Sequence, residues 1–587
     1  MKELQKTFLA GLSVLIVLLL APYYLQWVGY DVSEDVNQEV LDINEVVPVT
    51  KQTSNLYNKK QSHPGDDKTV LVKSEMVKHQ NKMFTISNDM YVAQISNYGG
   101  GSFAKFSLNQ HKGRWDFSGN YLDTNKVLLV SDEGLGTCAP CVSYNQEVFT
   151  ERFNCGLEGV NNMMADIYLE EGVHDSVSLV CALQTKDLLI EKRSTFYSNS
   201  LLINHVIWVN GFELDNLNAT NSLGLFWDKG LNNTEKNLYD DISYSSVSIS
   251  ENKKIETSSL IPSSINDNME DLISSGGLVD WVAMRTKYFI LAVLPPNKSE
   301  LFNRVVCRGD AQNIAGESLA PRYSLTVSKN IEPNGGTVSF NTYLGPLDID
   351  YINALDTTLD RIMNFGWFVI QPFSRGILWL LKSLNSLGLN YGVILILFAF
   401  LVRIITGPLT KKSFESTQKM QAIQPKLKKI QDKYKSDPQK LNTEMVKLYR
   451  ENGVNPLGGC LPMLLQMPLL FSLFLVFRST IEFRGASFVW WIKDLSLPDT
   501  IINLPFTIPI YGDQIAFLPI LLGISMFLTQ KMSMSNMDTG MGQQKYMMYF
   551  MSAFFFLIFN SFPSGLNLYY LIYNILNYLQ QKSLKKV

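Results

Sequence analysis

The 587-residue sequence lacks several features on which common function classes depend. Its charges nearly balance, with 51 Lys and Arg against 54 Asp and Glu, which is unlike a nucleic-acid-binding protein. It contains no P-loop and therefore no recognisable nucleotide site. In the long polar stretch from Asp31 to Asp350, His and Cys form no cluster with metal-ligand spacing, and no Ser/His/Asp arrangement is found. The usual marks of DNA binding, nucleotide hydrolysis and metal or triad catalysis are thus missing.

Long apolar runs are confined to the first thirty residues and to the chain beyond Leu387. A helix that crosses the hydrocarbon core of a bilayer needs about 20 apolar residues. Six segments approach this length and predict a polytopic α-helical membrane protein: Thr7–Val28, Leu389–Leu409, Leu457–Phe477, Ile515–Gln530, Tyr546–Phe562 and Leu566–Gln580.

The first apolar segment could be a cleaved signal peptide or a permanent anchor. It follows Lys2 and Lys6, but Ala21-Pro22-Tyr23-Tyr24 contains no small-x-small cleavage pattern. Its aromatic end is typical of a membrane interface. We therefore favour an uncleaved anchor over residues 1–30, followed by a polar, aperiodic linker over residues 31–80.

The distribution of basic residues predicts the topology. Short cytoplasmic loops are rich in Lys and Arg, and eleven of these residues lie between Lys411 and Arg450, with three more in the C-terminal tail. The segment after the first span is instead acidic, with Asp31, Glu34 and Asp35 and no lysine before Lys51. Both termini are expected in the cytoplasm and the large polar domain outside.

Residues 81–350 are predicted to form an all-β sandwich domain. Short alternating or β-branched runs recur between turn residues, for example in Tyr91–Ile95, Leu201–Val209 and Tyr288–Leu294. His205 is expected to be an ordinary strand residue rather than a ligand. Cys138-Ala139-Pro140-Cys141 has the spacing of a redox motif, but a strand-like stretch follows it, so structural disulfides or free thiols are favoured.

Residues 360–387 are predicted to form an amphipathic helix in the membrane interface. The apolar residues from Ile377 to Leu387 recur at helical spacing, with Arg375 and Lys382 between them. A helix packed on the β-domain is the alternative. A membrane core over residues 388–587 follows.

The basic loop over residues 411–452 predicts an antiparallel helical hairpin. An apolar seam steps by three and four residues through Ile423, Leu427 and Ile430, and it resumes at Met445 and Leu448 after the break at Ser436-Asp437-Pro438. Pro425 is expected to distort the first arm. The lysines could be a solvated face, or a docking arm for anionic lipid, ribosomal RNA or a targeting factor, for which the candidates are Lys426, Lys428, Lys429 and Lys433.

Arg403 lies inside the second predicted span, in Phe398–Ile405. An arginine at mid-membrane costs about 2.5–3.5 kcal/mol on insertion scales, so it should face water or a partner. It could also snorkel to the cytoplasmic headgroups, because Leu409 is only about 9 Å further along the helix. No acidic residue in the other spans offers an ion pair, which favours a wet cavity.

Other polar residues of the spans could line the same cavity or simply form hydrogen bonds between helices. Asn567 and Asn574 are seven residues apart and share a helix face with Tyr570. The whole set comprises Gln466, Thr529, Gln530, Asn567, Asn574 and Asn577. Methionines crowd the fourth and fifth spans and the loop between them, where they could adapt to varied apolar partners or fill the core.

Several motifs resemble the YidC membrane-protein insertases of Gram-negative bacteria, a family shared with mitochondrial and chloroplast insertases. Asn455–Pro468 is similar to the family's third-span motif, and Gly407-Pro408-Leu409-Thr410 to the end of its arginine-bearing span. Further agreement lies in Gln424-Pro425-Lys426, Phe562–Leu566 and Tyr569-Tyr570, and in the β-domain in Trp281–Met284, Tyr288-Phe289 and Tyr343–Pro346. Two positions depart from the pattern: Ala399, where a hydroxyl is frequent, and Ser561, where Trp is frequent.

The resemblance implies a bacterial inner-membrane protein with a periplasmic β-domain and five core spans around a hydrophilic groove open to cytoplasm and lipid. The groove residues would be Arg403, Ala399, Gln466, Tyr570 and Asn574. The family is not enzymatic and uses no cofactor. It inserts and chaperones nascent membrane proteins, alone or with the Sec translocon and its accessory subunits, receives them from the ribosome and contacts membrane lipids.

Two other function classes compete with this interpretation. A secondary transporter of an anionic solute could use an intramembrane arginine, but transporters usually show internal repeats, and none is visible among these spans. A membrane-anchored sugar-binding protein would account for the β-domain, but it leaves the C-terminal spans and the basic hairpin unexplained.

Overall fold

The computed structural model describes residues 80–585, apart from 110–125, 132–136, 160–164, 212–220, 261–269, 315–317, 333–334, 356, 436, 454–460, 509–510, 535–549 and 551–552. The predicted anchor over residues 1–30 and nearly all of the predicted linker over residues 31–80 lie outside the described residues. So do the first part of the Asn455–Pro468 motif and most of the methionine-rich loop.

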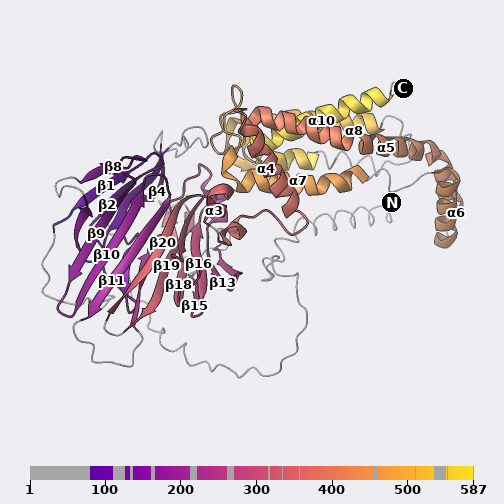
Figure 1. The fold of residues 1–587 in the computed structure, drawn as a ribbon. Helices are drawn as coiled ribbons and strands as arrows, with labels where there is room; N and C mark the ends of the chain where they lie inside the picture. The colour runs from indigo at the N-terminus through magenta and orange to yellow at the C-terminus, as the bar shows by residue number, and fades with distance from the viewer. Residues whose placement is uncertain are drawn as a thin grey trace, which may run out of the picture. The chain divides into compact units, whose positions relative to one another are not determined.

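The chain from Met83 to Pro346 forms three sheets, which confirms the predicted all-β character of this region (Figure 1). The first sheet has the order β4 (Lys126–Ser131), β3 (Ser102–Asn109), β2 (Tyr91–Ser96), β1 (Met83–Ser87), β8 (Asp166–Tyr168). The second has the order β14 (Lys254–Ser258), β13 (Ser246–Glu251), β16 (Val279–Arg285), β17 (Phe289–Leu294), β20 (Gly335–Pro346), β11 (Leu202–Gly211), β10 (Leu188–Tyr197), β9 (Ser176–Gln184), β7 (Asn154–Glu158). The third has the order β15 (Glu270–Ser275), β18 (Arg304–Ile314), β19 (Ser318–Ile331), β12 (Asn221–Trp227), β5 (Cys141–Tyr144), β6 (Glu147–Val148).

Alternation of buried and exposed residues explains how these strands pack. Along β9, every second side chain from Val177 to Leu183 is buried, as expected for a strand with one covered face. In β17 all six side chains are buried, so this strand is covered on both faces. The sheets meet at Phe103 of β3, whose ring contacts Phe196 of β10 at 6.3 Å and Trp227 of β12 at 6.1 Å.

Two disulfides lie in the β-region. Cys138 pairs with Cys141 and Cys155 with Cys181, whereas Cys307 is free and buried. Cys141 begins strand β5, as the sequence predicted, and its side chain is fully buried, so an exchanging thiol cannot reach it. A Cβ added at Gly99, which has a φ of +58°, would meet Cys141 Sγ at 2.0 Å, so the glycine turn allows the close approach of this disulfide.

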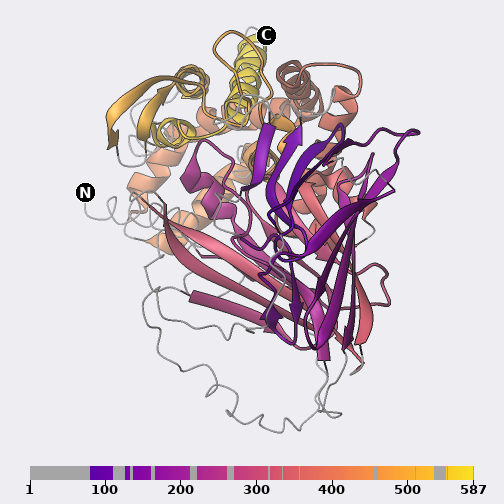
Figure 2. The same ribbon diagram turned by 90° about the vertical axis from the view of Figure 1, so that its left-hand side faces the viewer.

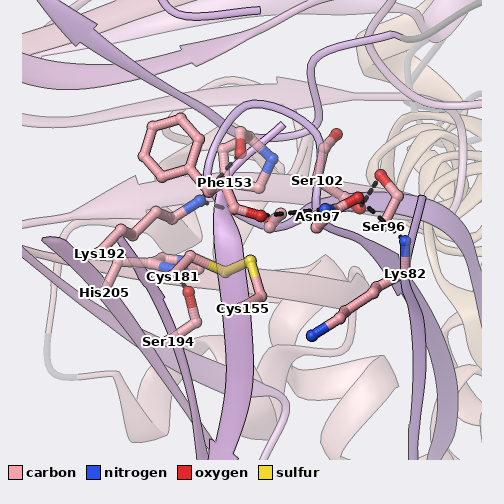
Figure 3. The surroundings of a disulfide bond; sticks show 12 residues. Lys82, Ser96, Asn97, Ser102, Phe153, Cys155, Cys181, Lys192, Ser194 and His205 are labelled. Atoms are coloured by element: carbon pink, nitrogen blue, oxygen red, sulfur yellow. Dashed lines mark hydrogen bonds between the residues drawn. A yellow bond between two sulfur atoms is a disulfide. The ribbon is translucent and has the colours of Figure 1, made fainter. Parts of the chain in front are cut away.

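A buried cation lies beside the second disulfide (Figure 3). Lys192 Nζ donates to the carbonyl oxygen of Pro140 at 2.9 Å and to that of Gly101 at 3.4 Å. His205 is a packed strand residue, as predicted, and its ring nitrogens lie 2.9 Å from Ser194 Oγ and 3.0 Å from Thr342 Oγ1. Burial, and then the charge of Lys192, hold the pKa of His205 well below its usual value.

One short described helix, α2, lies between β12 and β13, and the others follow the β-region; the C-terminal ones gather in one bundle in the turned view (Figure 2). The described helices are α2 (Leu238–Tyr244), α3 (Ile349–Ala354), α4 (Gln371–Asn385), α5 (Tyr391–Lys433), α6 (Pro438–Glu451), α7 (Leu461–Ser479), α8 (Phe517–Met534) and α10 (Ser564–Lys585). Short 3-10 helices occupy Leu359–Ile362 and Ile481–Phe483, and residues 553–559 are also helical. A two-stranded hairpin of β21 (Thr500–Ile508) and β22 (Gly512–Ala516) precedes α8.

Helices occupy the positions of the five predicted core spans, but the structure does not show six spans. Within the described residues, only Tyr391–Met420 is long and apolar enough to cross a bilayer by itself. Gln466–Ser479 and Phe517–Met532 are shorter apolar helices. The predicted count of six depended on Thr7–Val28, which is not described, and on segments that are short or partly polar.

Helix α4 is amphipathic, as predicted for residues 360–387. Its inner face, with Ile377, Leu378 and Leu381, is buried and packs against α7 and α5 rather than on the sheets. The opposite face exposes Phe373 and Trp379, which are 47% and 69% accessible. Apolar side chains on both faces suit a helix that lies between the bundle and the membrane interface.

The predicted apolar seam of the basic hairpin is confirmed. Ile423 and Leu427 of α5 form a buried cluster with Leu448 of α6, and Met420, Ile430, Met445 and Tyr449 pack against it. Asp437 begins the second arm by accepting a hydrogen bond from the backbone N–H of Lys440. Helix α5 continues through Pro425, so the predicted distortion there does not end the helix.

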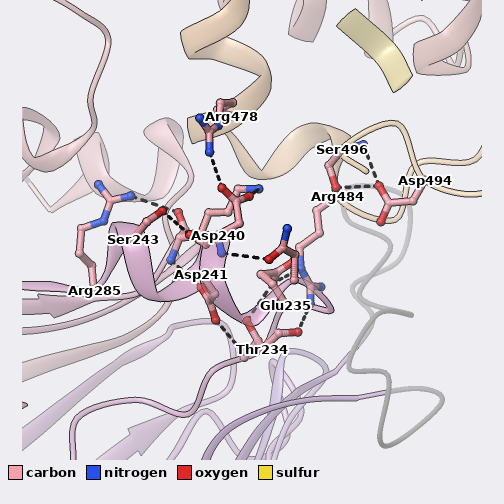
Figure 4. A network of polar contacts seen from close by, with 12 residues as sticks. Thr234, Glu235, Asp240, Asp241, Ser243, Arg285, Arg478, Arg484, Asp494 and Ser496 are labelled. Atoms are coloured by element: carbon pink, nitrogen blue, oxygen red, sulfur yellow. Dashed lines mark hydrogen bonds and ion pairs between the residues drawn. The ribbon is translucent and has the colours of Figure 1, made fainter. Parts of the chain in front are cut away.

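Two ion pairs, one of them buried, join the β-region to Arg478 near the end of α7 and to Arg484 in the chain that follows it (Figure 4). Arg478 pairs with Asp240 of α2, and Arg484 Nε lies 2.8 Å from Glu235 Oε1, with both side chains of the second pair at most 4% exposed. Lys287 also pairs with Asp240, at 2.7 Å. A second cluster brings Lys382 of α4 to the carboxylates of Asp348, Asp350 and Glu482. The two regions are therefore tied by paired charges as well as by the connecting chain.

Candidate groove around a buried arginine

Arg403 lies on the packed face of α5. Its neighbours Ile404 and Ile405 are 75% and 69% exposed, whereas Ala399 and Val402 are buried. The helix thus has an open apolar face suited to lipid and a covered face. Arg403 itself is only 8% exposed.

Two amide side chains of α10 bind its guanidinium. Nη2 of Arg403 donates to Asn577 Oδ1 at 3.0 Å and to Gln580 Oε1. Gln580 in turn donates to the carbonyl oxygen of Gly407 at 3.3 Å, which links α10 back to α5. The guanidinium carbon lies 5.6 Å from the centre of the Tyr573 ring. Among the described residues, no carboxylate forms an ion pair with Arg403.

The side chain of Arg403 lies in the wall of an open pocket of about 550 Å³, which is lined by Arg403, Ile404, Gly407, Pro408, Lys411, Leu576 and Gln580. Its remaining donors, Nε and Nη1, are buried and have no hydrogen-bond partner among the residues that the structure describes. Such donors are costly in an apolar environment. Because both atoms are buried, a movement of the arginine side chain is needed to bring them into contact with water or an acidic group in the pocket.

The other predicted groove residues do not line this pocket. Ala399 is fully buried, and Gln466 of α7 is half-buried. Tyr570 is buried against Phe559 and Tyr569 at ring distances of 5.6 and 5.0 Å. Asn574 donates to the carbonyl oxygen of Tyr570 within its own helix. The role of these four residues in a groove therefore stays a prediction.

The sequence placed Asn577 only among possible cavity residues, and Tyr573 and Gln580 were missed. These three residues step by four and three along α10 and form a stripe. The stripe of Asn567, Tyr570 and Asn574 lies next to it, since Tyr570 and Asn577 are seven residues apart. Asn567 donates to the carbonyl oxygens of Phe559 and Phe562, so it holds together the two ends of a loop. The spacing was available in the sequence, but nothing in it favoured one stripe over the other.

The four docking candidates, Lys426, Lys428, Lys429 and Lys433, are all exposed on the first arm of the hairpin. None forms an ion pair with another described residue. Their side chains point away from the buried seam of Ile423 and Leu427 because the intervening positions of a helix face outward. The arm therefore presents an uncompensated positive surface.

Comparison with known proteins identifies the family. The profile of the YidC periplasmic domain matches residues 168–380, and that of the 60Kd inner membrane protein matches residues 382–587. Membrane protein insertase YidC of Chlorobaculum parvum (strain DSM 263 / NCIMB 8327) is 33% identical over 505 residues, which cover 85% of this chain and 81% of that protein. This chain belongs to the YidC family.

Other members of the YidC family match a shorter part of their length. Membrane protein insertase YidC of Chlorobium phaeovibrioides (strain DSM 265 / 1930) is 40% identical over 391 residues, covering 66% of this chain and 65% of the relative, just under two thirds of its length. A crystal structure titled active YidC insertase, with its first transmembrane domain resolved, is 18% identical with a TM-score of 0.33, over 86% of this chain and 93% of that one.

Membership of the YidC family confirms the resemblance found in the sequence motifs. It makes the chain a membrane-inserted protein with a periplasmic domain. The periplasmic-domain profile covers the strands from β9 to β20 and most of α4, and the inner-membrane-protein profile covers the helices from α5 to α10.

Proposed function

We propose that this chain is a membrane-protein insertase and chaperone that takes nascent membrane proteins through the pocket around Arg403. The observation that carries the proposal is a nearly buried arginine that is bound only by neutral groups and lies in the wall of an open pocket between α5 and α10. The names of the relatives support the same class.

The physical argument concerns the polar part of a client. Moving a charged or hydrogen-bonding segment across about 30 Å of hydrocarbon is costly. A hydrated pocket within the inner part of the bilayer shortens this path, and the Arg403 charge attracts acidic groups of the segment more strongly there than in bulk water. The client's apolar helix then leaves past the exposed face of α5 into lipid, driven by burial of its apolar surface.

The proposal includes a topology and partners. Both termini and the lysine-rich hairpin lie in the cytoplasm of a bacterial cell, the helices span the inner membrane and the β-domain lies in the periplasm. The hairpin docks ribosomes that carry nascent chains, and the core works alone or beside the Sec translocon and its accessory subunits. The exposed lysines of the first arm support the docking role.

The test is insertion of one client into proteoliposomes, with and without the acidic residues of its translocated tail. Arg403→Lys keeps the charge and should retain much of the activity, although it loses the planar fork. Arg403→Ala should slow the acidic-tail client roughly tenfold, equivalent to about 1.4 kcal/mol, and the neutral-tail client much less. Lys411→Ala is the matched control, because Lys411 lines the same pocket but is exposed, where water screens its charge.

The outcomes separate the alternatives. If Arg403→Ala slows insertion of the acidic-tail and neutral-tail clients equally, the arginine contributes by hydrating the pocket and not by attracting acidic groups. Normal insertion of both clients by Arg403→Ala would contradict the proposed site. A transporter of an anionic solute would instead lose solute uptake with Arg403→Lys as well, because the bidentate geometry is lost.

A further inference from the structure

The hairpin of β21 and β22 has no role in the proposed groove. It lies between the outer end of α7 and the start of α8, and β22 leads into α8 without an intervening loop, at Ala516 and Phe517. Its pairing is irregular, with register shifts between Thr500 and Ile502 and between Asn503 and Ile508. By its place in the chain, the hairpin is held at the membrane surface on the side of the β-domain.

Buried polar side chains attach this hairpin to the bundle from its turn to the end of β22. Asn560, which is fully buried, donates to the carbonyl oxygens of Tyr511, in the turn, and Gln514, in β22, at 2.8 and 2.7 Å and accepts from the backbone N–H of Ala516 at 3.0 Å. Asp499, 4% exposed, accepts from the backbone N–H of Leu518 at 2.8 Å and from the Trp491 indole at 3.0 Å. The turn, β22 and the residue before β21 are therefore held in place.

The rest of the hairpin and the loop before it expose large apolar side chains. Ile501, Ile502 and Phe506 of β21 are 49%, 53% and 61% exposed, and Trp490 in the preceding loop is 92% exposed. An exposed apolar surface of this kind is unusual on a face that meets water. No described residue covers these side chains.

Trp490 is presented by an unusual backbone. Its φ of +40° lies in the left-handed region, which costs a bulky residue energy. The turn is closed by backbone hydrogen bonds from Phe488 to Ile492 and from Ile492 to Val489, at 3.0 and 2.8 Å. These bonds hold the indole away from the protein, so its own packing against the fold does not explain the conformation.

We propose that Trp490, Ile501, Ile502 and Phe506 form an anchor that inserts into the interfacial region of the outer leaflet. This inference rests on the proposed topology. It commits to lipid because the hairpin lies in the chain between two apolar helices, α7 and α8, of a membrane-inserted protein, and because α8 itself exposes apolar side chains such as Ile524, which is 53% exposed. The loop before the hairpin also carries an exposed lysine, Lys493, three residues after the exposed Trp490, and lysine and tryptophan are typical of the headgroup region of a bilayer.

The anchor has a physical consequence for the insertase. Strand β22 leads directly into α8 and is joined through Asn560 to the segment before α10. Insertion of the exposed side chains of β21 would therefore set the depth of these helix ends in the bilayer. The outer ends of the helices that a client passes would then stay at a constant depth in the bilayer.

The test measures depth in the full chain, reconstituted into vesicles of phosphatidylethanolamine and phosphatidylglycerol. A genetically encoded, environment-sensitive fluorescent amino acid replaces Phe506 in one sample and Trp490 in another. The matched references replace Ile524 on the lipid face of α8 and Glu170, which is exposed in the β-domain. Quenching is compared for iodide in water and for lipids with a quencher near the headgroup, placed in one leaflet at a time.

If the anchor inserts, the fluorescent amino acid at position 506 or 490 should emit at shorter wavelength than at position 170. Its fluorescence should be quenched several-fold more by the quencher-bearing lipid than by iodide. Quenching by iodide as strong as at Glu170 would overturn it. Protection of both labelled positions from both quenchers would also overturn it, because a protein partner rather than lipid would then cover Trp490 and Phe506. A reversed topology is distinguishable, since it would move lipid quenching to the other leaflet without changing the depth.

Discussion

At the scale of the residue, the fold holds two nearly buried cations in different ways. Lys192 in the β-region is fully buried and donates to two backbone carbonyls. Arg403 in the bundle is bound by two side-chain amides and lies in the wall of an open pocket. The first arrangement encloses the side chain completely, whereas the second places it beside an open space.

Burial lowers the pKa of Lys192 from 10.5 to about 7. Between these values the unfolded chain keeps the proton that the folded chain has lost, so raising the pH favours the folded state. We expect the unfolding temperature of the β-domain in the detergent-purified full chain to rise from pH 7 to pH 9.5. The rise should be absent in Lys192→Met, in which no group at this position titrates.

The neighbouring His205 does not interfere with this measurement, because its depressed pKa keeps it neutral over the whole interval. Exposed Lys186→Met is a control that should preserve the rise. An unfolding temperature of the unaltered chain that is flat or falls with pH would show that Lys192 stays charged in the fold.

At the scale of the element, different residues of the basic hairpin provide its stability and its surface charge. The seam of Ile423, Leu427 and Leu448 holds the arms together, and the four lysines lie outside it. Changing the lysines should therefore leave the hairpin folded, since none of them forms an ion pair with a described residue.

We expect replacement of Lys426, Lys428, Lys429 and Lys433 by Gln to weaken binding of nascent-chain ribosomes. For single-stranded phosphates, the slope of log affinity against log salt should fall by about 0.7 for each lysine that contacts a phosphate. The measurement is co-sedimentation with ribosomes at several salt concentrations. Lys440→Gln with Lys447→Gln, on the other arm, is the matched control. If the fourfold variant and the unaltered chain bind ribosomes with the same affinity and the same salt dependence, the lysines form only a solvated surface.

At the scale of the whole molecule, the β-domain is attached to the bundle by charges that neither part can bury alone. Arg484 and Glu235 come from different parts and lose nearly all exposure where they meet. Burial, and then the nearby charge of Glu235, raise the pKa of Asp241 to about 6, even though it accepts backbone hydrogen bonds from Thr234 and Lys287. The junction is therefore sensitive to any change that leaves one charge without its partner.

We expect Glu235→Gln to destabilise this junction by about 1.5–3 kcal/mol, because the buried Arg484 loses its hydrogen bond to a carboxylate and keeps only the more distant charge of Asp494. The measurements are denaturant unfolding of the full chain and protease cleavage within residues 347–370. Glu158→Gln breaks an exposed pair with Arg193 and should cost less than about 1 kcal/mol. Equal stability and cleavage of the two variants would show that the buried pair does not hold the parts together.

The sequence by itself determined the local structure of this protein. Strand alternation along β9, the helical seam of the hairpin and the apolar runs of α5, α7 and α8 depend on neighbours within a few residues, so spacing alone predicts them. The motifs around Pro468 and Pro408 were enough to identify the family resemblance. The number of spans was harder to predict. Apolar helices such as Gln466–Ser479 and Phe517–Met532 are shorter than a bilayer-crossing helix needs, so their length and composition alone do not identify them as spans.

Only the tertiary structure decided which distant residues meet. Arg403 binds Gln580, which is 177 residues away, and Arg478 binds Asp240, which is 238 residues away. Two adjoining stripes of α10 carry polar side chains at suitable spacing, and only the packing of α10 on α5 brings Tyr573, Asn577 and Gln580 to the arginine. The physical reason is that a helix period places residues on a common face, whereas helix packing decides which face is covered.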